Sequence, residues 1–364
     1  RFAGRPDGKD FMTSPFEHPW LSGLFGDAEA TEIWGPTRQM THMIAFERAY
    51  TQGLCKVGTI SEDTAKEVAR TFDDFQCDME ALRSATARDG VVVPELVRQI
   101  RGSAGSHGEA IHSGATSQDV IDTALVLTLK DYSNLLKRRL LELMEVFDAL
   151  SARFGSRRGM GRTRMQAAMP IAARERFATW SQPLDDHRQR LTQTRPRVER
   201  LQLGGAAGDR AALPHAESLG AEVALRLGLA KPPKAWHAMR DAVVDYAGLL
   251  SLISRMLDKM GQNICLMAQQ GVDEITLDNA GGSSAMPHKQ NPVLAELLVT
   301  LARFNATQVS AMHQGLAHEQ ERSGAAWALE WMVLPQMAQA TARSLAASIA
   351  ICQAISHVGS KDIR

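Results

Sequence analysis

Residues 281–293, GGSSAMPHKQNPV, are the stretch of this sequence best suited to chemistry. Two glycines and two serines adopt turns at low cost, and Pro292 precedes an apolar pattern typical of a helix. A helix start offers unpaired N–H groups to an anion, and Lys289 adds a positive charge beside them. We therefore predict an anion-binding loop that closes over its ligand. An ordinary Gly/Ser linker before a helix is the alternative.

A second polar cluster, Thr116, Ser117 and Gln118, directly precedes another strongly apolar pattern. Thr116 or Ser117 can cap the following helix, and Asp119 lies in the first turn, where the helix dipole favours a carboxylate. Hydroxyl and amide groups at a helix start also bind the carboxylates of a ligand. The cluster is therefore either a well-capped helix start or part of an anion site.

Residues 159–170, GMGRTRMQAAMP, place Arg162, Thr163, Arg164 and Gln166 in a predicted turn that enters a helix. Two guanidinium groups in one turn can hold a carboxylate through paired hydrogen bonds. Basic residues in a solvated loop are the alternative, so this stretch alone is a weak indication of a site.

A fourth polar stretch, residues 313–327, lies between two long apolar patterns. His313 and His318 are five residues apart, which does not place two metal ligands on one helical face. Arg322, followed by Ser323 and Gly324, is a better candidate for an anion contact. A solvated helix end is the alternative.

The overall composition narrows the class of protein. Of 364 residues, 44% are hydrophobic, and Lys+Arg and Asp+Glu both total 41, so no net charge favours nucleic acid or an anionic membrane. The cysteines are widely spaced, which indicates neither a disulfide framework nor a zinc site. No apolar run reaches the roughly 18 residues that span a bilayer. We expect a cytoplasmic protein without metal, membrane or nucleic-acid partners.

Five long helices must position these polar stretches. The first is predicted at about residues 120–154, of which some thirty residues make a rod of about 45 Å at 1.5 Å per residue. The other four are predicted at about residues 172–203, 239–271, 292–316 and 325–357. Strand signals are scarce, so we predict an all-α fold, a bundle of five long helices.

The chain divides by pattern into four parts. We expect residues 1–13 to be a disordered leader outside the fold, residues 14–108 an N-terminal helical domain, residues 109–357 the long-helix bundle, and residues 358–364 a tail. Several long helices carry apolar residues on more than one face, which predicts association with copies of the chain. Polar turns at opposite ends of long rods cannot meet within one chain, whereas antiparallel copies can bring them together.

Residues 281–293 resemble the signature loop of the fumarase/aspartase superfamily, with its glycine, two serines, Met-Pro pair, lysine and Asn-Pro pair in this order. Residues 111–123, IHSGATSQDVIDT, resemble the first signature region of that superfamily, and residues 163–170, TRMQAAMP, resemble the second. The three matches and the helices between them cover most of the chain.

Within the superfamily, the sequence resembles the bacterial 3-carboxy-cis,cis-muconate cycloisomerases at residues 89–101, 201–208 and 319–331. The resemblance implies the superfamily fold with a smaller N-terminal helical domain and a shortened C-terminal domain. It also implies a homotetramer in which each site is shared between three chains.

The resemblance implies a cofactor-independent enzyme that converts 3-carboxy-cis,cis-muconate to 4-carboxymuconolactone in the β-ketoadipate pathway of aromatic catabolism. In this reaction the substrate's own carboxylate is the nucleophile, and it adds to a double bond that lies next to a second carboxylate. The addition passes through a carbanion whose negative charge spreads into that second carboxylate. The alternatives are a 3-sulfomuconate cycloisomerase, a fumarate-releasing lyase resembling adenylosuccinate lyase, and a non-catalytic protein resembling the lens crystallins of this superfamily.

The resemblance also implies roles for individual residues. Ser283 matches the serine acid/base, Lys289 supports its alkoxide, and Arg164 replaces a histidine that many relatives use for proton transfer. An arginine is too basic to shuttle protons but suits holding a carboxylate nucleophile. Ser113 stands where a bulkier residue is expected, which leaves a sulfonate substituent possible. The implied substrate-binding residues are His112, Thr116, Ser117, Gln118, Thr163, Gln166, Ser284, Met286, Asn291 and Arg322.

Overall fold

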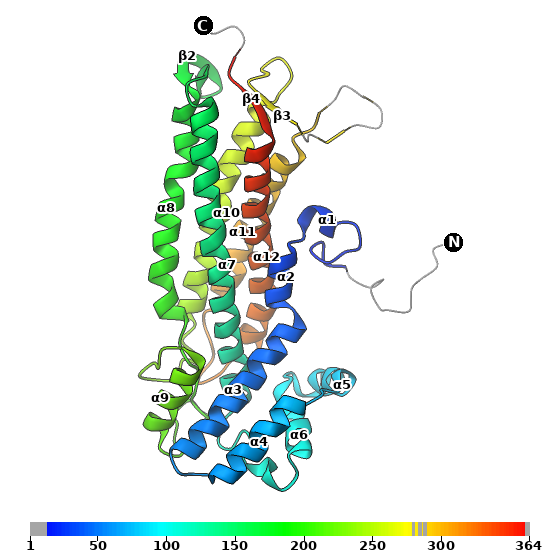
Figure 1. Cartoon of the computed structure of the whole chain (residues 1–364), viewed down its shortest axis with the longest axis vertical. Coiled ribbons are helices and arrows are strands. Elements are labelled where there is room, and N and C mark those ends of the chain that lie inside the picture. Colours follow the sequence, from blue (N-terminus) through cyan, green and yellow to red (C-terminus); the bar gives the residue numbers. More distant parts are fainter. Residues whose placement is uncertain (1–12, 279–280, 283–285, 287–289, 361–364) are drawn as a thin grey trace, which may run out of the picture.

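Five long helices run side by side along the long axis of the molecule (Figure 1). The computed structural model describes residues 13–278, 281–282, 286 and 290–360. The long helices are α7 (Ser117–Phe154), α8 (Ala173–Val198), α10 (Asp241–Met267), α11 (Val293–Gln314) and α12 (Gly324–Ala354). The predicted all-α fold with five long helices is confirmed.

Helix α7 begins where the sequence predicts a cap. Thr116 is its N-cap residue, and the Asp119 carboxylate accepts a hydrogen bond from the Thr116 N–H at 3.1 Å. Its 38 residues make a rod of about 57 Å at 1.5 Å per residue. The apolar stripe of α7 packs into the bundle core, in which Leu136, Leu140 and Leu143 are fully buried. Burial of this stripe stabilises a helix far longer than the average.

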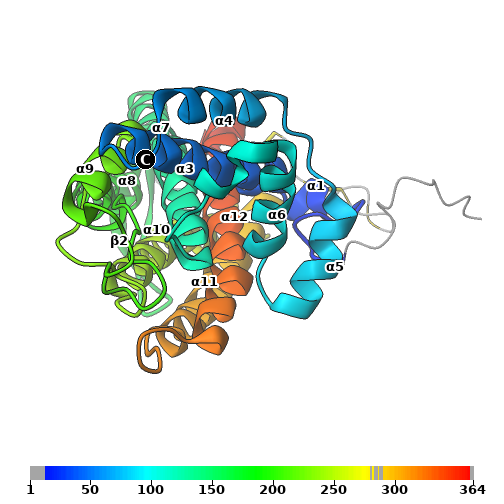
Figure 2. The ribbon, with the colours of Figure 1, turned by 90° about the horizontal axis from the view of Figure 1, so that it is seen from below.

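Shorter helices form a layer at the end of the bundle where α7 begins, here called the lower end (Figures 1 and 2). The elements of this layer are α3 (Pro36–Lys56), α4 (Glu62–Asp74), α5 (Met79–Asp89), α6 (Val93–Ser103), η2 (Gly105–Ala110) and α9 (Ala216–Leu227). They enclose a second apolar core, to which residues 201–224 also contribute. The domain limits at residues 108 and 357 stay a prediction.

Two further helices lead into this layer along the bundle, α1 (Ser22–Phe25) and α2 (Ala28–Trp34). The buried Arg139 of α7 donates to Asp27, the N-cap of α2, at 2.6 Å and to Glu29 at 2.8 Å. An almost fully buried ion pair is costly to break once formed, so this contact fixes α2 against α7.

In the described part of the chain, four short strands stand at the opposite, upper end of the bundle. β1 (Arg158–Thr163) and β2 (Gln166–Ala172) form an antiparallel hairpin, and β3 (Ile275–Leu277) pairs with β4 (Ile355–Val358). The prediction of a simple turn at residues 159–170 is therefore wrong. The hairpin is rich in glycine, alanine and methionine, which are weak strand formers, so the sequence carries little strand signal. The paired backbones, rather than side-chain propensity, make the strands.

Helices α10 and α11 approach closely at Gly261. A Cβ at this position would lie 2.5 Å from the Ala295 carbonyl oxygen and 3.0 Å from the Leu298 Cβ. We predict that Gly261→Ala pushes the helices apart and lowers the free energy of unfolding by about 1–3 kcal/mol, measured by urea denaturation.

The matched control is Gly102→Ala on α6, where an added Cβ meets nothing within 4 Å. There the better helix propensity of alanine should raise the free energy of unfolding by up to about 1 kcal/mol. Equal effects of the two substitutions would contradict the close helix crossing.

Candidate active site

The start of α7 is held in place by one buried carboxylate. Asp119 is fully buried and accepts hydrogen bonds from the N–H groups of Gly204 at 2.8 Å and Gly205 at 2.9 Å. The same carboxylate lies 2.9 Å from His237 Nε2. A Cβ on Gly204 would lie 2.6 Å from Ala235 Cβ, so only glycine allows this approach. Residues 201–208 are thereby fixed against the first signature region.

Arg322 joins this cluster from the loop between α11 and α12. Its Nη2 donates to Thr116 Oγ1 at 3.2 Å and to the Ala206 carbonyl at 3.1 Å. Arg322 and Thr116 are 206 residues apart in the sequence. The structure thus brings together Thr116, Ser117 and Arg322 at the lower end, with His112 in the same loop. These side chains supply hydroxyl, imidazole and guanidinium groups that suit an anionic ligand.

Gln118 lies beside these residues but points inward. Its side chain is fully buried, and its amide donates to Asp122 Oδ2 and to the His237 carbonyl, both at 3.0 Å. The role of Gln118 in substrate binding stays a prediction. In this chain its hydrogen bonds connect the first turn of α7 to residues 236–240.

One turn further along α7 lies a buried charged network that sequence spacing does not reveal. Arg240 is fully buried and donates to Asp122 Oδ2 at 2.6 Å and to Glu330 Oε2 at 2.5 Å. Trp327 Nε1 donates to Asp122 Oδ1 at 3.0 Å. Burial raises the pKa of Glu330, although the Arg240 guanidinium opposes this shift. The network connects α7 to α12 and so to the loop that carries Arg322.

The β1–β2 hairpin carries the second signature region at the upper end. Arg164 and Met165 form its tip with positive φ angles of 50° and 66°. Thr163, Arg164 and Gln166 are exposed. Arg162, which the sequence suggests as a second carboxylate clamp, instead donates to Glu274 Oε1 at 2.9 Å.

Glu274 is the buried partner that fixes this hairpin. It is 1% exposed and accepts hydrogen bonds from Arg176 Nη1 at 3.2 Å and from the Met160 N–H at 3.1 Å, besides that of Arg162. Glu274 directly precedes β3, which leads towards the signature loop. One carboxylate therefore connects the second signature region to the base of the signature loop.

The signature loop is closed at its base by a backbone pair. The Gly281 N–H donates to the Asn291 carbonyl at 2.9 Å, and the Asn291 N–H returns a bond to Gly281 at 2.8 Å. Ser283, Ser284 and Lys289 lie outside the described residues. Their predicted roles stay predictions.

A hollow of about 680 Å³ lies beside this loop base and is lined by Met286, Asn291 and Glu296 among others. Glu296, in the first turn of α11, also lines this hollow, although the sequence motifs did not indicate it as a site residue. Burial, with the Glu296 charge nearby, raises the pKa of the Cys265 thiol to about 11 in the same hollow. Cys265 is therefore protonated at neutral pH and no nucleophile.

Apart from the signature loop, the predicted site residues form two groups that one chain keeps apart. His112, Thr116, Ser117, Gln118 and Arg322 lie at the lower end, whereas Thr163, Arg164 and Gln166 lie on the hairpin at the upper end (Figure 1). The whole of α7 separates the first group from the hairpin, a distance of roughly 55 Å along its axis. A small ligand cannot contact both groups of the same chain.

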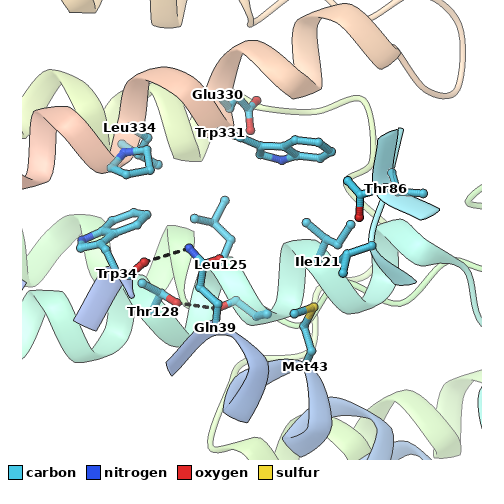
Figure 3. A pocket seen from close by; sticks show the side chains of 14 residues that line it. Trp34, Gln39, Met43, Thr86, Ile121, Leu125, Thr128, Glu330, Trp331 and Leu334 are labelled. Carbon is cyan, nitrogen blue, oxygen red and sulfur yellow. Dashed lines mark hydrogen bonds between the residues drawn. The ribbon is translucent and has the colours of Figure 1, made fainter. Parts of the chain in front are cut away.

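A separate cavity of about 290 Å³ lies between α2, α3, α7 and α12 (Figure 3). Its walls are mainly apolar, with Trp34, Met43, Leu125 and Trp331 around the space. The one charged side chain in its lining is Glu330, which is acidic and bound to Arg240. Such a lining does not suit a polycarboxylate.

The described part of the chain contains neither a cluster suited to a metal ion nor a helix able to cross a membrane. Within it, no cluster of three or more His, Cys, Asp or Glu residues is arranged to hold a metal ion. None of its helices combines the length and the hydropathy that crossing a bilayer requires.

Comparison with known proteins identifies the class. Residues 23–309 match the lyase family model, which represents the fumarase/aspartase superfamily. The chain therefore belongs to this family. The predicted superfamily membership is confirmed, and the chain is an enzyme of this superfamily. Such enzymes act on small carboxylate substrates and are typically oligomeric.

Individual relatives are similar over most of the chain. The 3-carboxy-cis,cis-muconate cycloisomerase of Acinetobacter baylyi is 32% identical, covering 89% of this chain and 74% of the relative. The N-acetyl-S-(2-succino)cysteine lyase of Enterococcus italicus is 30% identical, covering 87% and 70%. The crystal structure of the 3-carboxy-cis,cis-muconate lactonizing enzyme from Pseudomonas putida is 30% identical with a TM-score of 0.87, covering 93% and 77%.

The Asp122–Arg240–Glu330 network yields a stability prediction. Arg240→Leu leaves two buried carboxylates without their cation, so we expect the free energy of unfolding to fall by about 3–5 kcal/mol in urea denaturation. Arg70→Leu is the control, because Arg70 forms an exposed ion pair with Glu67 on α4. Its loss should cost less than about 1 kcal/mol. Similar losses for both variants would contradict the role of the network.

Proposed function

We propose that this enzyme is a cofactor-independent cycloisomerase that closes 3-carboxy-cis,cis-muconate to 4-carboxymuconolactone, within the β-ketoadipate pathway. The main support is Arg164, which stands at the exposed hairpin tip and makes no hydrogen bond or ion pair with another described residue. A guanidinium holds a carboxylate through paired hydrogen bonds but does not exchange protons at neutral pH. This suits a reaction whose nucleophile is a carboxylate of the substrate itself.

The relatives support the same assignment. At 32% identity, the Acinetobacter baylyi cycloisomerase matches this chain over 89% of its length. The lactonizing enzyme from Pseudomonas putida has the same fold, with a TM-score of 0.87.

The reaction balances without a redox step. One carboxylate oxygen of the substrate bonds to a carbon of the diene, and the displaced π electrons move to the adjacent carbon and its carboxylate. A proton from the Ser283 hydroxyl then reaches that carbon, and Lys289 stabilises the resulting alkoxide until water returns the proton. Three carboxylates become two carboxylates and a lactone, so each turnover takes up one proton.

The substrate carboxylates need donors from both ends of the bundle. We propose that Thr116, Ser117, His112 and Arg322 of one copy, with the buried Gln118 behind them, face Thr163, Arg164 and Gln166 of a second copy. The loop with Ser283, Ser284, Met286, Lys289 and Asn291 comes from a third copy. A homotetramer of antiparallel bundles meets this requirement. The exposed Leu252 and Leu266 of α10 offer apolar surface for such contacts.

We also propose that the enzyme acts in the cytoplasm. Its four cysteines are free thiols, and none forms a disulfide with another. Free thiols fit a reducing compartment.

A second candidate is a lyase that releases fumarate. The 30% identity to the N-acetyl-S-(2-succino)cysteine lyase favours it, because the chain matches 70% of that relative's length. Such a reaction must protonate a leaving sulfur or nitrogen, for which Arg164 is unsuited. A 3-sulfomuconate cycloisomerase is a close variant of the first proposal, since Arg322 and Arg164 can bind a sulfonate as well as a carboxylate.

The proposed function predicts loss of ultraviolet absorbance when the enzyme is mixed with 3-carboxy-cis,cis-muconate without added cofactor. Lactone formation interrupts the conjugated diene, so the absorption band falls. Ser283→Ala should lower kcat by about 10²–10⁴-fold with the fold retained.

Parallel assays with 3-sulfomuconate, adenylosuccinate and N-acetyl-S-(2-succino)cysteine distinguish the candidates. Faster turnover of the sulfonate would reassign the substrate, and fumarate release in preference to lactone formation would contradict the proposal. Inactivity on all four compounds would exclude each of these substrates.

A further inference from the structure

The loop that carries His112 is held on both sides by side chains of the lower helical layer. Arg101 of α6 donates from Nε and Nη2 to the Ile111 carbonyl at 3.1 and 2.8 Å. The Tyr50 hydroxyl of α3 donates to the Ser113 carbonyl at 2.5 Å. The position of the His112 backbone is therefore fixed before any ligand binds.

His112 itself pairs with a buried carboxylate. Its Nδ1 lies 2.6 Å from Oε1 of Glu47 on α3, and the Glu47 side chain is fully buried. Within the described part of the chain, the second Glu47 oxygen is buried and accepts no hydrogen bond. Burying a carboxylate with so few partners is unfavourable, and this one is directed at the histidine ring.

The backbone of His112 is also strained. Its φ angle is 61°, in the left-handed region that is costly for residues other than glycine. Such strain persists where the surroundings impose it, and it is concentrated at functional sites. Strain and a buried carboxylate at one residue point to a function for this ring beyond packing.

The pairing engages Nδ1 and so leaves Nε2 as the ring nitrogen available to a ligand. An ionised carboxylate only accepts hydrogen bonds, so Nδ1 must carry a proton and donate it to Glu47. The neutral ring then presents a lone pair on Nε2, which repels a ligand carboxylate. When Nε2 is protonated as well, it becomes a donor that binds a carboxylate.

We propose that Glu47 is a positioning residue that restricts His112 to binding a substrate carboxylate in its doubly protonated form, so that substrate binding takes up a proton. The proposal rests on the proposed function only for the substrate class, a polycarboxylate. It explains why a buried acid lies behind the ring, where a neutral hydrogen-bond acceptor would also satisfy Nδ1.

The other charged groups around this loop are engaged elsewhere. Arg101 donates to the Ile111 carbonyl, the Asp119 carboxylate lies within hydrogen-bond distance of His237 Nε2, and Arg322 donates to Thr116. Burial, with Asp119 and Glu47 nearby, raises the pKa of Tyr50, which stays a neutral donor at physiological pH. Glu47 is therefore the acidic group in contact with the His112 ring.

Calorimetry with tricarballylate, a tricarboxylate without a double bond to react, tests the proposal on the full-length protein. Titrations at about pH 7.5 in two buffers of different ionisation enthalpy report protons taken up on binding. We expect clear proton uptake by the wild type, with Kd rising up to about tenfold per pH unit once the ring is neutral.

Three variants separate the Glu47 pairing from general effects. In Glu47→Gln the side-chain amide can either accept a hydrogen bond from Nδ1 or donate one to it. A neutral His112 ring can then carry its proton on Nε2 and bind a carboxylate. Proton uptake should therefore vanish, and Kd should become independent of pH. His112→Asn, which tolerates the positive φ angle, should bind more weakly and without proton uptake. Glu95→Gln, which removes a carboxylate bound to Arg98 on α6, should behave as the wild type.

Three results would overturn the proposal: no proton uptake by the wild type, unchanged uptake in Glu47→Gln, or no binding of tricarballylate. The lactonisation assay is independent, since tricarballylate binding needs no turnover. Binding with proton uptake but without lactone formation would support the role of Glu47 and reject only the proposed reaction.

Discussion

The length of α7 is the constraint on which the arrangement of this site depends. Thr116 caps its first turn, and the hairpin with Arg164 follows its last turn, 38 helical residues later. At 1.5 Å per residue these groups stand roughly 55 Å apart, several times the size of a small polycarboxylate. A helix of this length is stabilised by burial, mainly against α3, α8 and α12, so the bundle that makes the fold stable also prevents a complete site within one chain.

Each end of the bundle is organised by buried carboxylates that join distant parts of the sequence. At the lower end, Asp119 fixes residues 204–205 and Asp122 shares Arg240 with α12. At the upper end, Glu274 holds the hairpin beside the base of the signature loop. Buried ion pairs add little to net stability, but removing one partner is costly, so they specify one geometry. That geometry leaves the Arg322 guanidinium exposed, and nearby hydroxyl and imidazole groups partly exposed, for a partner copy.

Much of this structure could be predicted from the sequence, because long helices and their caps are local features. The apolar stripe of α7 and its cap at Thr116 follow from residues a few positions apart. The hairpin at Arg158–Ala172 could not be predicted, since its pairing is stabilised by backbone contacts and by Glu274, about a hundred residues later.

The sequence motifs predicted the residues expected to contact the ligand, but not the buried charged residues that hold them in place. Glu47, Arg240 and Glu330 are ordinary charged residues in helical patterns, and nothing in the spacing distinguishes them from solvated ones. For Arg162 the sequence-based prediction was wrong in the opposite direction. Its position in a basic turn suggested a contact with the ligand, whereas in the fold it forms an ion pair with Glu274. Burial, which the fold alone determines, separates these cases.

The most direct test of a site shared between copies is activity in mixed oligomers. Ser283→Ala alters the signature loop, whose described base lies at the upper end, and Arg322→Met alters the lower end. Each variant alone should be nearly inactive in lactone formation. If each site takes these two residues from different copies, oligomers assembled from equal amounts of both variants should regain about a quarter of the wild-type activity. A mixture no more active than its parents would show that both residues act from one chain, which contradicts this account.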